Sequence, residues 1–142
     1  MFTNTRNTAK AYVSVGATSG ALSASPHGLV IMLFDGAQAA VAAARMHMQL
    51  RQIPEKAKAI SKAVSIIQDG LMASLDRDAG GELADQLFNL YEYMVSRLIE
   101  ANLGNDSGPL EEVGRLLAEL GNAWKAIGKT NANQSVAELG GQ

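Results

Sequence analysis

The sequence has 142 residues, of which 47% are hydrophobic, 5% aromatic and 18% charged, and its formal net charge is −2. This length predicts one domain, and the near balance of charges gives no electrostatic reason to expect nucleic acid as a partner. Cysteine is absent from the sequence, which excludes disulfides, thiolate nucleophiles and cysteine-ligated metals.

The most apolar stretch, residues 29–44, is interrupted by Asp35 and Gln38. It is shorter than the roughly 20 apolar residues that a membrane span needs, so we expect no stable membrane insertion. The N-terminus also lacks a hydrophobic block behind a basic start, which a secretory signal would show. The expected location is therefore the cytoplasm.

Residues 1–24 are rich in Ser, Thr, Gly and Ala and predict a mobile N-terminal arm. Tyr12 and Val13 are the only adjacent bulky pair in it. One hypothesis is that Tyr12 anchors the arm as a lid over a groove. The alternative is a lone tyrosine in a disordered arm.

Prolines 26, 54 and 109 each stand where a helix is expected to begin, because the amide hydrogen that proline lacks has no partner there. The Gly80-Gly81 pair marks a further break. These signals predict helices at about residues 26–51, 54–75, 81–103 and 109–127, which form a bundle of residues 25–128. We expect a loose polar tail at residues 129–142. The short connections predict an all-α, antiparallel up-down-up-down four-helix bundle.

The first two predicted helices carry more apolar surface than a bundle core requires. The helix at 54–75 has two neighbouring apolar stripes that cover roughly 200° of its circumference, whereas a bundle helix needs an inward arc of a little over 100°. The helix at 26–51 is apolar on nearly opposite sides. Two explanations stay open: central packing under the N-terminal arm, or a partner that covers the excess. Tyr93 falls outside the apolar stripe of the third helix and is expected to be exposed.

The ionisable residues do not assemble a catalytic or metal site. The only histidines, His27 and His47, have alanine three residues earlier, where a di-metal bundle requires glutamate. No glycine-rich phosphate loop occurs. The basic residues Arg51, Lys56, Lys58 and Lys62 are interpreted as solvated surface. We therefore predict a protein that is not an enzyme and has no cofactor or metal.

Three motifs in order resemble the FliS family of flagellin export chaperones. They are Ser23-Ala24-Ser25-Pro26 followed by residues 29–37 (LVIMLFDGA), residues 90–94 (LYEYM) leading into residues 97–102 (RLIEAN), and a run from Leu110 to Trp124. The resemblance spans about residues 12–127. Phe34, where the family usually has Tyr, and His27-Gly28, in place of a common acidic pair, depart from its pattern.

The resemblance implies a cytoplasmic chaperone that binds the disordered C-terminal segment of flagellin, prevents its premature polymerisation and presents it to the export gate protein FlhA. It also implies that an N-terminal tyrosine, matching Tyr12, folds over part of the binding surface. A groove of Leu, Ile, Met and Ala suits the apolar face of a partner helix. The residues we assign to the groove and its lid are Tyr12, Met32, Met46, Ile66, Leu71, Tyr91, Tyr93 and Met94.

A second function class also accounts for the surplus apolar surface. The chain would then be a self-associating helical bundle, and the surplus would form the interface of an oligomer. A homodimer of the free protein is compatible with both functions. Mass in solution with and without a flagellin C-terminal peptide separates them.

Overall fold

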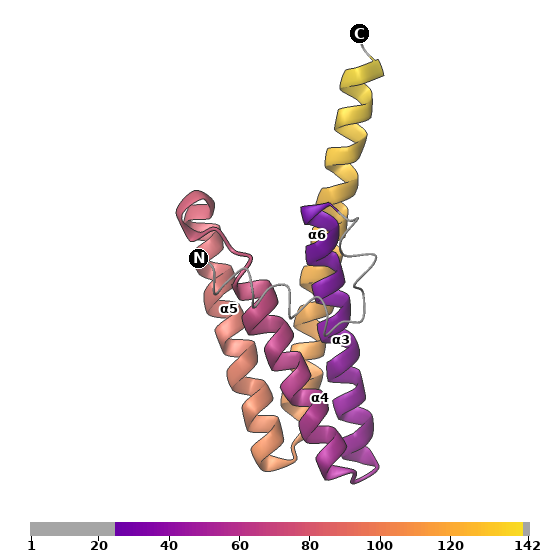
Figure 1. Ribbon diagram of the computed structural model, residues 1–142, viewed down its shortest axis with the longest axis vertical. Coiled ribbons are helices and arrows are strands. Elements are labelled where there is room, and N and C mark those ends of the chain that lie inside the picture. The colour runs from indigo at the N-terminus through magenta and orange to yellow at the C-terminus, as the bar shows by residue number, and fades with distance from the viewer. Residues whose placement is uncertain (1–24, 141–142) are drawn as a thin grey trace.

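The structure, a computed structural model, describes the backbone of residues 25–140 and the side chains of residues 25–128. These residues form helices and no strand: α3 (Pro26–Gln49), α4 (Ile53–Ser65), the π-helix η1 (Ile66–Met72) that continues α4, α5 (Arg77–Gly104) and α6 (Ser107–Gly140) (Figure 1). The predicted all-α four-helix bundle is confirmed. Tyr12 and the predicted N-terminal arm lie outside the described residues.

The prolines mark the helix starts as expected. Pro26 is the first residue of α3, and the hydroxyl of Ser25 accepts a hydrogen bond from the amide of Gly28 at 3.1 Å, which caps that helix. Ile53 opens α4 one residue before Pro54, and Ser107 opens α6 two residues before Pro109. A proline in the first turn therefore marks the start of three of the four helices.

The third predicted helix, α5, begins earlier than residue 81, where the sequence placed its start. Its first residue is Arg77, because the Asp76 carboxylate accepts a hydrogen bond from the amide of Ala79 at 3.0 Å and caps the helix. The predicted break survives as a kink at Gly81, where φ is 57° and ψ is −135°, a conformation that residues with a side chain rarely adopt. At the other end, Asn105 in the left-handed conformation closes the helix after Gly104.

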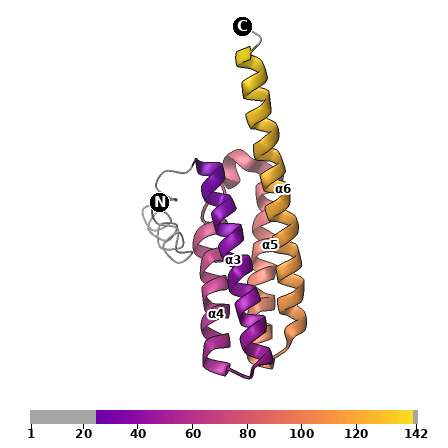
Figure 2. The same cartoon turned by 90° about the vertical axis from the view of Figure 1, so that its right-hand side faces the viewer.

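The predicted end of the last helix is wrong. α6 continues past Gly128 to Gly140, through the segment that was expected to be a loose tail. A single glycine costs only about 1 kcal/mol relative to alanine in a helix, which is too little to end one. The residues that follow include the helix-favouring Ala132, Gln134, Ala137, Glu138 and Leu139. Figures 1 and 2 show this part of α6 extending beyond the other helices.

Each rod runs antiparallel to the next along the chain (Figures 1 and 2). α3 packs most extensively, against α4 on one side and α6 on the other, and α5 packs against α6, η1 and α4. The fully buried large side chains include Leu33, Phe34, Ile66, Ile67, Leu71, Met94, Leu98, Leu110 and Leu117. By length and apolar composition α3 could span a membrane, whereas the sequence predicted that no segment could. In the structure α3 is a core helix, and its buried residues are Leu33, Phe34, Ala37, Ala40, Val41 and Ala44.

Two expectations about the second rod are corrected. Lys56 is 2% exposed and is not part of a solvated basic patch. Ile66, which was assigned to a partner groove, and its neighbour Ile67 are both fully buried. They begin the π-helix. Ala63, three residues before Ile66 on α4, is fully buried as well, so this side of the helix already faces the core before the π-helix begins.

Candidate functional site: an apolar groove between α4 and α5

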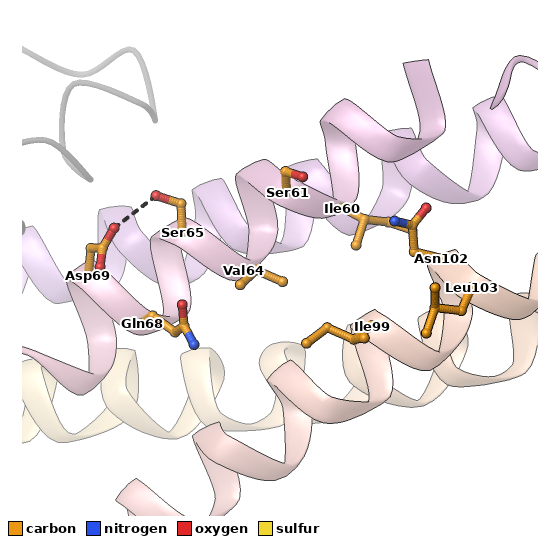
Figure 3. Close-up of a pocket in the computed structure, with 9 residues that line it drawn as sticks. All are labelled: Ile60, Ser61, Val64, Ser65, Gln68, Asp69, Ile99, Asn102 and Leu103. Carbon is orange, nitrogen blue, oxygen red and sulfur yellow. Dashed lines mark hydrogen bonds between the residues drawn. The ribbon is translucent and has the colours of Figure 1, made fainter. Parts of the chain in front are cut away.

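A groove with a volume of about 300 Å³ lies between α5 and the continuous helix formed by α4 and η1 (Figure 3). α4 and η1 form one wall and the C-terminal turns of α5 form the other. The lining residues are Ile60, Ser61, Val64, Ser65, Gln68 and Asp69 on the first wall, and Ile99, Asn102 and Leu103 on the second.

The centre of the groove is apolar and open, and toward one end Ile60 and Leu103 lie beside the polar Asn102 (Figure 3). Leu103 is 81% exposed and Ile99 is 48% exposed, whereas Ile60 is buried in the floor. Figure 3 shows Val64 and Ile99 facing each other across the opening, with Leu103 toward one end. Each wall presents its apolar pair at i, i+4 spacing, which places both members on one face of the helix. Two parallel apolar edges of this kind match the apolar face of an added helix.

The opposite end of the groove is polar. The hydroxyl of Ser65 donates to Oδ2 of Asp69 at 3.1 Å, and the amide side chain of Gln68 lies beside them (Figure 3). No Lys, Arg or His among the described residues forms an ion pair with Asp69. Within the described part of the chain, this end therefore holds a carboxylate whose partner is a neutral hydroxyl.

Lys56 forms hydrogen bonds between the two walls at the Leu103 end of the groove. Its Nζ donates to the backbone carbonyl of Asn102 at 3.0 Å and to Oδ1 of Asn105 at 2.5 Å. The carbonyls at a helix C-terminus favour positive charge, so the ammonium has a compatible environment even though it is buried. The contact ties the first turn of α4 to the last turn of α5 and holds the two walls together there.

A second hollow, of about 350 Å³, lies at the other end of the bundle. It is lined by Val30, Ser74, Leu75, Asp76, Ala79, Gly80, Leu83, Ala84, Leu87, Tyr91 and Trp124. Trp124 stacks on His27, with ring centroids 5.2 Å apart and an interplanar angle of 9°. Burial raises the pKa of Tyr91 to about 12, so this hydroxyl stays neutral over the physiological range.

Most of the residues that the sequence assigned to a partner surface lie elsewhere. Ile66, Leu71, Tyr91 and Met94 are core side chains, and their assignment to an accessible groove is corrected; of these, Tyr91 also lines the second hollow. Met32 is half-buried, and Met46 is exposed near the end of α3. None of the described members of the predicted set lines the α4–α5 groove.

Tyr93 is exposed as expected, at 43%, and the structure gives it a partner between helices. Its hydroxyl donates to Oε1 of Glu112 at 2.8 Å, and Nε of Arg97 donates to the same oxygen at 2.7 Å. These two hydrogen bonds hold the pKa of Glu112 below its usual value, and the bond to Glu112 raises the pKa of Tyr93. Tyr93 thus joins α5 to α6.

Sequence reasoning missed Ile99 and Leu103. They are four residues apart and therefore share a face of the third helix, and Ile99 directly follows the core residue Leu98. They form a short second apolar edge on that helix. That edge was the available signal. On α4, the apolar stripe that contains Ile60 and Val64 was recognised, but its exposed flank was not located.

A helical bundle with an open apolar groove is typical of proteins that bind a helical partner segment. The groups of His, Asp and Glu in the described part of the chain include none able to hold a metal ion. Comparison with known proteins agrees with this class. The family described as "Flagellar protein FliS" matches residues 8–131.

Individual relatives carry the same description over most of their length. A "Flagellar secretion chaperone FliS" of Salmonella typhimurium (strain LT2) is 48% identical over 118 residues, covering 83% of this chain and 87% of the relative. "Flagellar secretion chaperone FliSB" of Pseudomonas aeruginosa is 45% identical, covering 83% and 93%, and the FliS chaperone of Vibrio cholerae is 35% identical, covering 95% and 98%. The chain belongs to the FliS family of flagellar secretion chaperones.

Proposed function

We propose that the chain binds the C-terminal segment of flagellin in its α4–α5 groove, with the segment in amphipathic helical form. The observation that carries this proposal is the exposed apolar pair Ile99 and Leu103 along an open groove, with Ile99 facing Val64 across it. Such a surface is costly in water and becomes favourable when an apolar helix face covers it. The family supports flagellin as the partner, because relatives of this chain are described as flagellar secretion chaperones.

Binding of this kind needs no nucleotide. Covering the apolar flank of flagellin removes the surface through which flagellin assembles, so the bound protein stays unpolymerised in the cytoplasm. Ordering a disordered segment costs roughly 2–5 kcal/mol or more. That cost lowers the net affinity and keeps the complex releasable. The chaperone therefore acts as a binding module rather than as an enzyme.

The proposal extends to delivery. The chain would present its bound flagellin to the export gate protein FlhA, and the N-terminal segment with Tyr12 would cover part of the binding surface until flagellin arrives. These two steps rest on the family resemblance. The described residues contribute the α4–α5 groove that the flagellin segment would cover.

Self-association is the second candidate function. Met46, Leu50 and Ile53 are exposed large apolar side chains around the α3–α4 connection. A second copy would bury such a corner in a homodimer. This corner and the α4–α5 groove are separate sets of residues, so mutations distinguish the two functions.

Titration calorimetry of the full chain with its flagellin C-terminal segment tests the proposal. We expect saturable one-to-one binding with a negative heat-capacity change, the mark of apolar burial. Mass measurement by light scattering accompanies it. A dimer whose mass and stability are unaffected by the segment would instead support the self-associating bundle.

A further inference from the structure

The polar end of the groove suggests what the bound helix must carry. Resting on the proposed function, we propose that Asp69 pairs with a Lys or Arg of the bound segment, so that the groove selects an apolar helix with one basic residue at a fixed spacing from its apolar anchors. The occupant is a partner segment of that chemistry. The ion pair sets the register of the helix along the groove.

The first support is that Asp69 forms no ion pair among the described residues, unlike three acids that lie between helices. Glu112, Glu111 and Asp35 pair with Arg97, Arg45 and Lys125 respectively. Asp69 lines the groove, is half-buried, and, among residues 25–128, accepts a side-chain hydrogen bond from the Ser65 hydroxyl alone. Among the described residues that line the groove, it is also the single ionisable one. A partly desolvated carboxylate without a counter-charge is stabilised by a ligand cation.

The second support is the division of the groove along its length. Leu103 and Ile99 occupy one end and the centre, and Asp69 with Ser65 occupies the other end (Figure 3). Ile60, beside the Leu103 end, precedes Asp69 by nine positions in the sequence. At a rise of about 1.5 Å per residue this corresponds to roughly 13 Å. A bound helix spans that distance in about nine residues.

These dimensions define a pattern in the ligand. Apolar anchors at i and i+3 or i+4 would lie over the Leu103–Ile99 edge, and a basic residue at about i+7 or i+8 would share their face. The long stem of Lys or Arg covers the remaining distance while its apolar carbons stay on the groove. An acid at the same position would meet Asp69 and be repelled.

Two designed peptides of about 20 residues, long enough to form a helix on binding, test the pairing. They share one apolar face and differ only in Lys or Glu at the predicted position. Fluorescence anisotropy measures their affinity for the full chain. We expect the wild type to prefer the Lys peptide by about fivefold, since a pair near the surface contributes about 1 kcal/mol. Asp69→Asn should level the preference, and Asp69→Lys should reverse it.

Glu119→Lys is the matched control, because Glu119 is exposed on α6 and outside the groove. It makes the same charge change and should leave the preference as in the wild type. An unchanged preference in Asp69→Lys would overturn the pairing. A preference altered as strongly by Glu119→Lys would also overturn it, because net charge alone would then explain the result.

A second variant separates failure of the pairing from failure of the groove. Ile99→Gln/Leu103→Gln removes the apolar edge with uncharged, helix-favouring residues and should weaken both peptides and the flagellin segment. If this variant binds everything as tightly as the wild type, the groove itself is the wrong site. A third outcome would assign the groove to a second copy of the chain: the wild type is a dimer, the double variant is a monomer, and the wild type binds neither peptide. That outcome would overturn the proposal.

Discussion

The ammonium of Lys56 is enclosed between the first turn of α4 and the end of α5, where it donates to the carbonyl of Asn102 and to the side chain of Asn105. Asn105 adopts the left-handed conformation that ends α5. The Lys56 side chain therefore links the start of α4 to the connection between α5 and α6. This link fixes one end of the groove.

Lys56→Met should destabilise the bundle by about 2 kcal/mol, because it keeps the apolar stem but removes the charged donor of two part-buried hydrogen bonds. Urea unfolding followed by circular dichroism measures the change. Lys58→Met is the matched control on the exposed face and should change the free energy of unfolding by less than about 0.5 kcal/mol. Equal effects of the two substitutions would show that Lys56 is not held as described.

Gly128 should not tolerate alanine, although alanine favours helices. A Cβ at this position would collide with Nε2 of His27, which lies in the stack on Trp124. Gly128→Ala should therefore displace the imidazole, lower the melting temperature and shift the emission of Trp124, the only tryptophan. Gly114→Ala is the control: its Cβ would meet Val41 at an ordinary 3.6 Å, so it should gain up to about 1 kcal/mol. A stabilised Gly128→Ala with unchanged emission would refute the packing.

Glu112→Gln should cost stability at neutral pH and progressively less in acid. The hydrogen bonds from Arg97 and Tyr93 lower the pKa of this carboxyl in the folded protein, so its ionised form stabilises the fold above the unfolded pKa. That contribution is lost as the pH falls through the folded value, below the ordinary glutamate pKa of about 4.3. Melting temperatures of wild type and variant should converge there. A difference that stays constant from pH 7 to pH 3 would contradict the assignment.

Ile66→Asp should unfold the bundle, whereas Tyr93→Asp should leave it folded. Ile66 is fully enclosed, and a carboxylate placed there would lose its hydration without gaining a partner. Tyr93 lies at the surface and would lose one hydrogen bond. Far-ultraviolet circular dichroism of both variants measures the outcome. Retained helicity in Ile66→Asp would mean that this side chain is not in the core.

The rods of the fold could be predicted because local chemistry places them. Proline at the start of a helix and glycine or asparagine after its end act through the backbone of a few residues, so the signals at Pro26 and Asn105 suffice without tertiary information. The end of α6 could not be found in this way, because Gly128 weakens a helix only slightly and the residues beyond it favour helix. Composition suggested a loose tail where propensity supported a helix.

The groove could be anticipated in kind but not located. The second helix does carry surplus apolar surface, yet Ala63 and Ile66 face the core and Val64 lies beside the opening. The pattern of a single helix does not contain its neighbours, and the neighbours decide which side faces the core. Lys56 was misplaced for a related reason, since its acceptors come from residues 46 and 49 positions away in the sequence.

The central claim is that the edge formed by Ile99 and Leu103 receives the flagellin segment. Titration calorimetry of that segment against wild type, Ile99→Gln/Leu103→Gln and the α6 surface variant Ile127→Gln tests it most directly. We predict that the groove variant binds at least about tenfold more weakly, given about 1.5–3 kcal/mol for each apolar side chain that is covered, while Ile127→Gln binds like the wild type. Equal affinities for all three proteins, each folded, would contradict it.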